Sequence, residues 1–317
     1  MTSNFVIPLA DPRADLATAG GKGASLARLL NAGLPVPDGF HITTEAYPAF
    51  LTLNDLEKHI VSALEPVNPI QPATQEAASE AIRSQFSSAR IPPEVTEAIT
   101  TAYGSLVGTK PAVAVRSSAT AEDLPDLSFA GQQETYLNIQ GTAEVLEAVK
   151  RCWSSLWTPR AIAYRIQHQI DHRTVRIAVV VQLLVPAEAA GILFTADPVT
   201  GARNRAVISA AWGLGEAVVG GLVTPDTLSV DKETGRVIDR QTADKQVMTV
   251  RLESGTHEQP VPQHQKTAPV LNDAQAAALA KLGVEIERLY GMPMDIEWTL
   301  ARGAFAIVQA RPVTSLP

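Results

Sequence analysis

The sequence has very little cysteine, no long apolar segment and no excess of basic residues. Its one cysteine, Cys152, rules out a disulfide within the 317-residue chain, and a cytoplasmic location is the simple expectation. No apolar run reaches the roughly 18 residues of a membrane span, and residues 1–10 lack the pattern of a signal peptide. Lys and Arg total 26 against 33 Asp and Glu, and without a basic stripe this net charge of −7 argues against a nucleic-acid partner.

The rest of the composition is typical of a soluble globular protein. Hydrophobic residues make up 45% and charged residues 19% of the chain. The length suits one large domain or two lobes around a cleft.

The central segment, 112–139, combines strand-like runs with polar groups. Ala112–Val115 predicts a short buried strand that ends on residues 116–118, Arg-Ser-Ser. Residues 119–127 are loop-like, Gly131 permits close backbone approach, and Thr135–Ile139 predicts a second strand. An arginine fork, two hydroxyls and an exposed glycine amide suit phosphate binding. The segment alone leaves open a β-hairpin with a long surface loop.

A glycine-rich stretch, residues 17–33 (ATAGGKGASLARLLNAG), places Lys22 at the start of a predicted short helix. A lysine and flexible glycines at a helix N-terminus suit an anion. The spacing is not that of a P-loop, because no Gly-Lys-Ser/Thr follows. A glycine-rich cap with a solvated lysine is the alternative.

Residues 294–312, MDIEWTLARGAFAIVQARP, predict a hairpin that turns at 302–304. A three-residue loop would put Glu297 opposite Gln309 and Asp295 opposite Arg311 on one face. Carboxylate and amide oxygens suit Mg²⁺, and arginine balances phosphate charge. A two-residue loop would separate Glu297 from Gln309, and a surface hairpin with an Asp–Arg pair remains the alternative.

Other segments carry weaker signals. Gln182 interrupts the apolar run Val175–Val185, where a purine edge or neighbouring backbone would satisfy its amide. His168 and His172 have the spacing of helical metal ligands but no evident third ligand, so a structural role is favoured. Residues 213–221 (GLGEAVVGG) do not match a dinucleotide fingerprint. We expect 249–267 to be an exposed loop and 273–290 a helix capped by residue 272 or 273.

Three of these segments resemble one family. They are similar to the nucleotide-binding domain of dikinases that share a phosphohistidine relay. The segments are RSSATAEDLPDLSFAGQQETYLN, GGKG, and DIEW followed by VQARP. These dikinases are phosphoenolpyruvate synthase, pyruvate phosphate dikinase and rifampicin phosphotransferase. The resemblance covers essentially the whole chain. It implies an α+β, ATP-grasp fold in which two lobes, about 1–186 and 187–317, clamp MgATP.

The resemblance also implies site residues and cofactors. The implied cofactors are ATP and Mg²⁺. The implied residues are Lys22, Arg116 and Arg311 on the phosphates with a catalytic role, Gly131, Thr135 and Gln182 on the nucleotide, and Glu297 and Gln309 on magnesium.

The implied reaction passes the β-phosphoryl group of ATP to a carrier histidine, with AMP and phosphate as the other products. None of the six histidines has the family's Thr-Ser-His setting. We therefore expect a donor domain whose partners are a swivelling phosphohistidine domain and an acceptor-binding domain, in the same longer chain or in separate proteins. The segments YRIQHQIDHR and GILFTADP favour rifampicin phosphotransferase, and phosphoenolpyruvate synthase is the alternative.

Two alternative functions of other kinds are also compatible with nucleotide binding. Carboxylate–amine ligation is disfavoured because no second-substrate site is visible. An ATP sensor without transfer is disfavoured because it would have no need of the magnesium pair.

The sensor and the transferase respond differently to Glu297→Gln. A sensor is expected to tolerate the change. Phosphoryl transfer is expected to fall by about 10²-fold or more, because a neutral amide replaces a charged metal ligand. The measurement is AMP formation alongside ATP binding in the full native gene product. Wild-type rates of AMP formation in the variant would contradict the magnesium role of Glu297.

Overall fold

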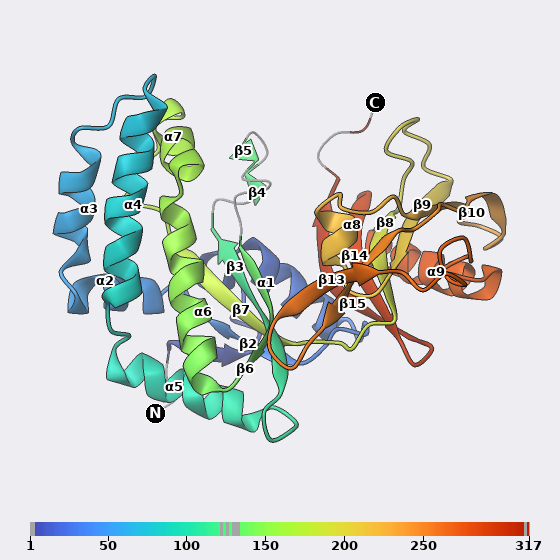
Figure 1. Ribbon diagram of the computed structural model, residues 1–317, viewed down its shortest axis with the longest axis horizontal. Helices are drawn as coiled ribbons and strands as arrows, with labels where there is room; N and C mark the ends of the chain where they lie inside the picture. The colour runs from blue at the N-terminus through green and yellow to red at the C-terminus, as the bar shows by residue number, and fades with distance from the viewer. Residues whose placement is uncertain (1–3, 121–122, 125–126, 129–133, 314–315, 317) are drawn as a thin grey trace. The chain divides into compact units, whose positions relative to one another are not determined.

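The computed structural model describes residues 4–120, 123–124, 127–128, 134–313 and 316. The chain forms two compact units. The first comprises Met1–Ala27 and Asp38–Leu184, and the second comprises Arg28–Pro37 and Val185–Pro317. Each unit has its own antiparallel sheet with helices (Figure 1). Among the described residues, no helix is both long and apolar enough to cross a membrane.

The first unit is built on a five-stranded sheet of order β1-β2-β7-β3-β6. Its elements in chain order are β1 (Val6–Pro8), α1 (Leu16–Asn31, which continues past Ala27), β2 (Gly39–Ile42), α2 (Ala46–Leu53), α3 (Leu56–Leu64), α4 (Pro72–Ser88), α5 (Pro93–Ser105), β3 (Ala112–Ala119), β4 (Asp123–Leu124), β5 (Leu127–Ser128), β6 (Thr135–Gln140), α6 (Thr142–Ser154), the 3-10 helix η1 (Ser155–Trp157), α7 (Pro159–Gln167) and β7 (Ile177–Leu183).

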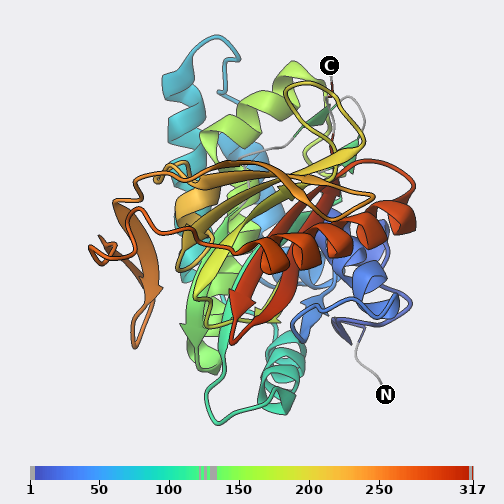
Figure 2. The same cartoon turned by 90° about the vertical axis from the view of Figure 1, so that its right-hand side faces the viewer.

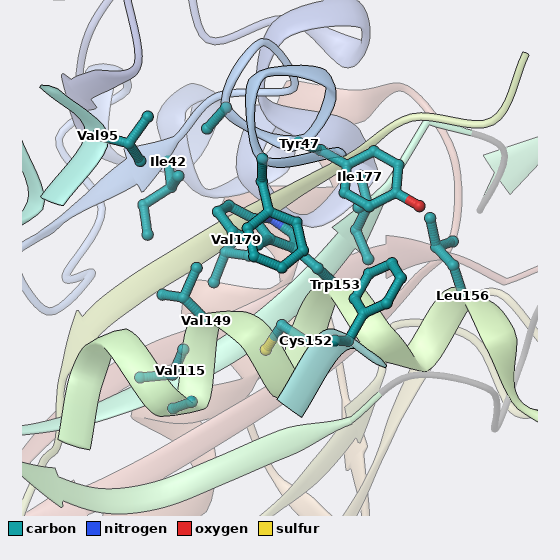
Figure 3. Close-up of a cluster of buried hydrophobic side chains, with 14 of the residues drawn as sticks. Ile42, Tyr47, Val95, Val115, Val149, Cys152, Trp153, Leu156, Ile177 and Val179 are labelled. Atoms are coloured by element: carbon teal, nitrogen blue, oxygen red, sulfur yellow. The ribbon is translucent and has the colours of Figure 1, made fainter. Parts of the chain in front are cut away.

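One face of this sheet carries the main hydrophobic core. α6 contacts β3, β6 and β7, and α4 and then α3 lie further out (Figure 1). Alternate strand residues such as Val115 and Val179 belong, with Trp153 of α6, to one cluster of buried side chains (Figure 3). Burying one such valine stabilises the fold by about 1.5–3 kcal/mol. The core therefore sets which face of each strand points inward.

The opposite face of the sheet carries polar side chains. Val180 pairs with Arg116 on one side and with His41 on the other, and Gln182 lies two residues further along β7. Side chains alternate along a strand, so these groups point away from the valine core. A small apolar cluster that includes Ile7 of β1 and Ala19 of α1 packs here.

The second unit has a six-stranded antiparallel sheet of order β11-β10-β9-β8-β14-β15. Its elements are β8 (Ala189–Phe194), β9 (Arg205–Trp212), α8 (Glu216–Val219), β10 (Asp226–Asp231), β11 (Val237–Gln241), β12 (Val247–Arg251), β13 (Thr256–Pro260), α9 (Asp273–Tyr290), β14 (Met294–Ala301) and β15 (Ala304–Pro312). α9 runs across one face of the sheet (Figure 2). Asn272, one of the two caps that the sequence predicted, caps α9 through a reciprocal capping box with Gln275.

Two sequence expectations about local structure are wrong. Residues 249–267 are not simply a loop, because β12 and β13 form a hairpin over Val247–Pro260. Its second strand is nearly all polar and exposed, so the sequence has no apolar alternation there. The Arg-Ser-Ser triplet lies within β3 rather than after it, because β7 pairs with β3 as far as Ala119.

α1 is kinked at Gly20, whose φ of 69° and ψ of 178° are not helical. This backbone region is accessible essentially only to glycine. A Cβ atom at Gly20 would also lie 2.2 Å from the carbonyl oxygen of Ser118. The kink thus requires glycine for both conformation and space.

Replacing Gly20 by alanine is expected to destabilise the first unit. The strained dihedrals alone cost about 1–3 kcal/mol, and the backbone contact adds to that. Urea unfolding monitored by circular dichroism measures the change. Gly104→Ala is the matched control, since Gly104 lies in α5 with nothing within 4 Å of a built Cβ, and alanine favours a helix. Equal unfolding midpoints for the two variants would contradict the kink.

Candidate active site

The candidate residues fall in both units. In the first unit, Lys22 lies just after the kink of α1. Its Nζ donates a hydrogen bond to the carbonyl oxygen of Ser117, at 3.0 Å. The lysine at the glycine-rich turn is therefore held beside β3, one residue from Arg116.

Three further predicted residues lie on neighbouring strands of the same sheet. Arg116 on β3 is directly opposite Thr135 on β6. Gln182 on β7 pairs with Ala114, two residues before Arg116, and so shares its face. Arg116 and Gln182 are buried, whereas Thr135 is exposed. Gly131 lies outside the described residues.

His41 is a residue of this face that sequence reasoning did not single out. It is fully buried on β2, and its Nε2 lies 3.0 Å from the carbonyl oxygen of Leu9. Burial lowers the pKa of His41 to about 4, so the imidazole is neutral at pH 7. Because a carbonyl oxygen can only accept, this hydrogen bond assigns the proton of the ring to Nε2. Nδ1 faces Gly23, and a Cβ atom added to Gly23 would lie 3.1 Å from Nδ1. The only signal in the sequence is a histidine within an apolar strand.

In the second unit, the predicted hairpin forms with a different turn. The loop has two residues, Arg302 and Gly303, both at positive φ, and Ala301 pairs with Ala304. A shift in register next to Glu297 adds one residue to β15. The expected three-residue loop is therefore wrong.

The expected pairs nevertheless occur in this hairpin. Glu297 lies directly opposite Gln309, and Asp295 lies opposite Arg311. A two-residue loop alone would have separated Glu297 from Gln309, and the extra residue of the bulge reverses that separation. Bulges commonly re-aim side chains next to active sites.

Asp295 and Arg311 form an ion pair across the two strands. Nε of Arg311 donates a hydrogen bond to Oδ2 of Asp295 at 2.9 Å, and Nη2 lies 2.8 Å from the same oxygen. Burial raises the pKa of Asp295, and nearby Glu297 adds to the rise, while Arg311 opposes it. The Arg311 side chain is half exposed, so it keeps contact with solvent while the aspartate orients it.

The donor set at this hairpin fits Mg²⁺. Among the described residues, no group of three or more His, Cys, Asp and Glu is placed to hold a metal. Magnesium is commonly bound through one or two carboxylates, with substrate phosphates and water completing the octahedron. Glu297 with the amide oxygen of Gln309 matches that mode. The alternative at His168 and His172 finds no support, because His172 Nδ1 accepts a hydrogen bond from Arg165.

Residues 16–317 match the family described as "Pyruvate phosphate dikinase, AMP/ATP-binding domain". A probable phosphoenolpyruvate synthase of Methanocaldococcus jannaschii is 48% identical over 95% of this chain and 26% of its own length. A rifampicin phosphotransferase of a Streptomyces species is 45% identical over 100% and 36%, and the phosphoenolpyruvate synthase of Pyrococcus furiosus is 42% identical over 95% and 42%. The chain thus spans less than half the length of each of these relatives.

The raised pKa of Asp295 predicts how Asp295→Asn changes stability with pH. A carboxyl whose pKa is raised by folding holds more protons in the folded than in the unfolded state, so its contribution to stability falls as the pH rises. The asparagine variant lacks this loss. Its free energy of unfolding relative to wild type is expected to grow as the pH rises from about 4 to 7.

Urea unfolding at several pH values, followed by tryptophan fluorescence, measures this difference. Asp273→Asn is the matched control, because Asp273 also pairs with an arginine, Arg240, but is exposed. A difference that shrinks with rising pH would mean that attraction to Arg311 outweighs the burial of Asp295.

Proposed function

Because the chain belongs to the pyruvate phosphate dikinase AMP/ATP-binding domain family, which has the ATP-grasp fold, we propose that it is the MgATP-binding donor domain of a dikinase. The observation that carries the proposal is the hairpin of β14 and β15. It places a carboxylate opposite an amide oxygen, with an oriented arginine two residues away on the same face. Such a set suits a metal-bound polyphosphate.

In the first unit, Lys22 and Arg116 bind phosphate oxygens in this proposal. Lysine supplies a point charge and arginine a planar fork of donors, and both counter the charge that shifts during phosphoryl transfer. The fixed position of Lys22 on the carbonyl oxygen of Ser117 lowers the entropy lost when phosphate binds. Thr135, next to Arg116 on the neighbouring strand, and Gly131 contact the nucleotide.

Gln182 recognises the adenine in this proposal. It is almost fully buried on β7, on the face that carries Arg116. An amide offers both a donor and an acceptor, which is what a purine edge requires.

In the second unit, Glu297 and Gln309 would hold Mg²⁺ through their oxygens. The ion would neutralise charge on the phosphate oxygens and orient them. Asp295 holds Arg311 by a hydrogen bond and an ion pair, so the guanidinium is preorganised for the terminal phosphate. Lys22, Arg116 and Arg311 are the proposed catalytic residues.

The whole reaction needs parts beyond those described. We propose that the β-phosphoryl group passes to a histidine of a swivelling domain and then to an acceptor, leaving AMP and phosphate. These partners lie in the same longer chain or in separate proteins, since the relatives are more than twice as long as their matched segments.

Two acceptors are candidates. Rifampicin is favoured by the sequence segments and by a rifampicin phosphotransferase that matches over 100% of this chain. Pyruvate is favoured by the higher identity of 48% to a probable phosphoenolpyruvate synthase. The two identities are too similar to decide, because the matched segments bind the shared nucleotide.

AMP release by the full native gene product, with rifampicin and pyruvate offered in parallel, tests the proposal. We expect AMP with one acceptor only, together with the phosphorylated acceptor. AMP that depends on rifampicin identifies a rifampicin phosphotransferase, and AMP that depends on pyruvate identifies a phosphoenolpyruvate synthase. ATP that yields ADP with either acceptor, and no AMP, would contradict a dikinase.

A further inference from the structure

The kink of α1 interrupts the backbone hydrogen bonding of the helix. In a regular helix, the amide of Gly23 would donate to the carbonyl oxygen of Ala19, four residues earlier. Here the hydroxyl of Ser118 takes both roles. Its Oγ accepts from the amide of Gly23 at 3.1 Å and donates to the carbonyl oxygen of Ala19 at 2.7 Å. One side chain of β3 thus replaces the missing bond.

This insertion depends on close approach between strand and helix. Ser118 is completely buried. A Cβ at Gly20 would lie 2.4 Å from Oγ of Ser118, so only glycine lets the hydroxyl reach the helix backbone. A helix end normally receives such a hydroxyl from its own N-cap residue. Here the capping group comes from a strand almost a hundred residues away in the chain, as the sequence separation of 95 shows.

Lys22 is held on both sides by this arrangement. The carbonyl oxygen of Ser117 accepts a hydrogen bond from Nζ of Lys22. The hydroxyl of the next residue, Ser118, accepts a hydrogen bond from the amide of Gly23. A Cβ atom at Gly23 would lie 2.7 Å from Cβ of Ala19 and 3.1 Å from Nδ1 of His41, so a side chain there would have to displace its neighbours. The ammonium group of Lys22 and the adjacent amide of Gly23 are therefore both hydrogen-bonded to β3, the strand that carries Arg116.

We propose that Ser118 is a positioning residue for Lys22. The inference rests on the proposed function, in which Lys22 binds a phosphate of ATP. Without the hydroxyl, the amide of Gly23 and the carbonyl of Ala19 can bond directly and remove the kink. Such a change turns Lys22 about the helix axis and away from the phosphate, while the adenine contacts remain.

Nucleotide binding by the 317-residue chain tests this inference. Equilibrium dialysis with labelled MgATP and labelled adenosine is applied to wild type, Ser118→Ala, Lys22→Met and the double variant. Ser118→Ala is expected to weaken MgATP binding by about tenfold, the loss of one charge-assisted contact, and to leave adenosine binding unchanged. In the Lys22→Met background, Ser118→Ala is expected to have no further effect on MgATP.

Controls separate positioning from a general role in stability. Thr44→Val removes another buried hydroxyl that donates to α1, at the carbonyl oxygen of Ala17 before the kink. It is expected to keep the ratio of MgATP to adenosine affinity. Ser118→Cys keeps a weak donor and acceptor, and is expected to give an intermediate loss of MgATP affinity should the alanine variant not fold.

The outcomes distinguish the two proposals. Failure of wild type to bind MgATP, or unchanged affinity in Lys22→Met, overturns the proposed function and this inference with it. A weakened Lys22→Met beside an unaffected Ser118→Ala overturns this inference alone. A parallel loss of MgATP and adenosine in Ser118→Ala, or an equal change of the ratio in Thr44→Val, also overturns it, because the hydroxyl then supports only the fold.

Discussion

The alternation of side chains along antiparallel strands is the constraint on which both sets of candidate residues depend. In the first unit, Val115 and Val179 enter the core, so Arg116 and Val180 must face the other way. In the second unit, Ile296 and Trp298 are buried, and Asp295 and Glu297 share the opposite face. The buried hydrophobic side chains thus fix the direction of the polar side chains, although they themselves lie on the face away from the candidate site.

This constraint makes register the sensitive quantity. A slip of one residue moves every side chain of a strand to the other face. The hairpin of β14 and β15 meets the requirement by two opposing departures from a simple hairpin, a two-residue turn and a bulge. The turn relies on positive φ at Arg302 and Gly303, and the bulge adds one residue beside Glu297. Together they bring Glu297 opposite Gln309.

Two ion pairs of the second unit differ in whether the positive charge is accessible to solvent. Lys245 and Asp226 are completely buried, and the aspartate also accepts from the backbone amides of Ala243 and Val270. All of its hydrogen bonds are internal, as a buried pair requires. Asp295 is also buried, but its partner Arg311 is half exposed. That guanidinium remains accessible to a ligand, whereas the ammonium of Lys245 is not.

The sequence by itself determined the local elements and the chemistry of the candidate residues. The apolar run of β7 and the capped helix α9 follow from periodicity and capping, which act over a few positions. The residue types at 22, 116, 297, 309 and 311 likewise indicated phosphate and magnesium.

Only the tertiary structure decided the contacts between distant segments. The bulge beside Glu297, the pairing that extends β3 through Ser118 and the hairpin of β12 and β13 depend on neighbouring strands. The hydroxyl of Ser118 reaches Gly23 only because the fold packs α1 against β3. No pattern in the sequence records such a contact, because its partners are far apart in the chain and each looks ordinary in its own segment.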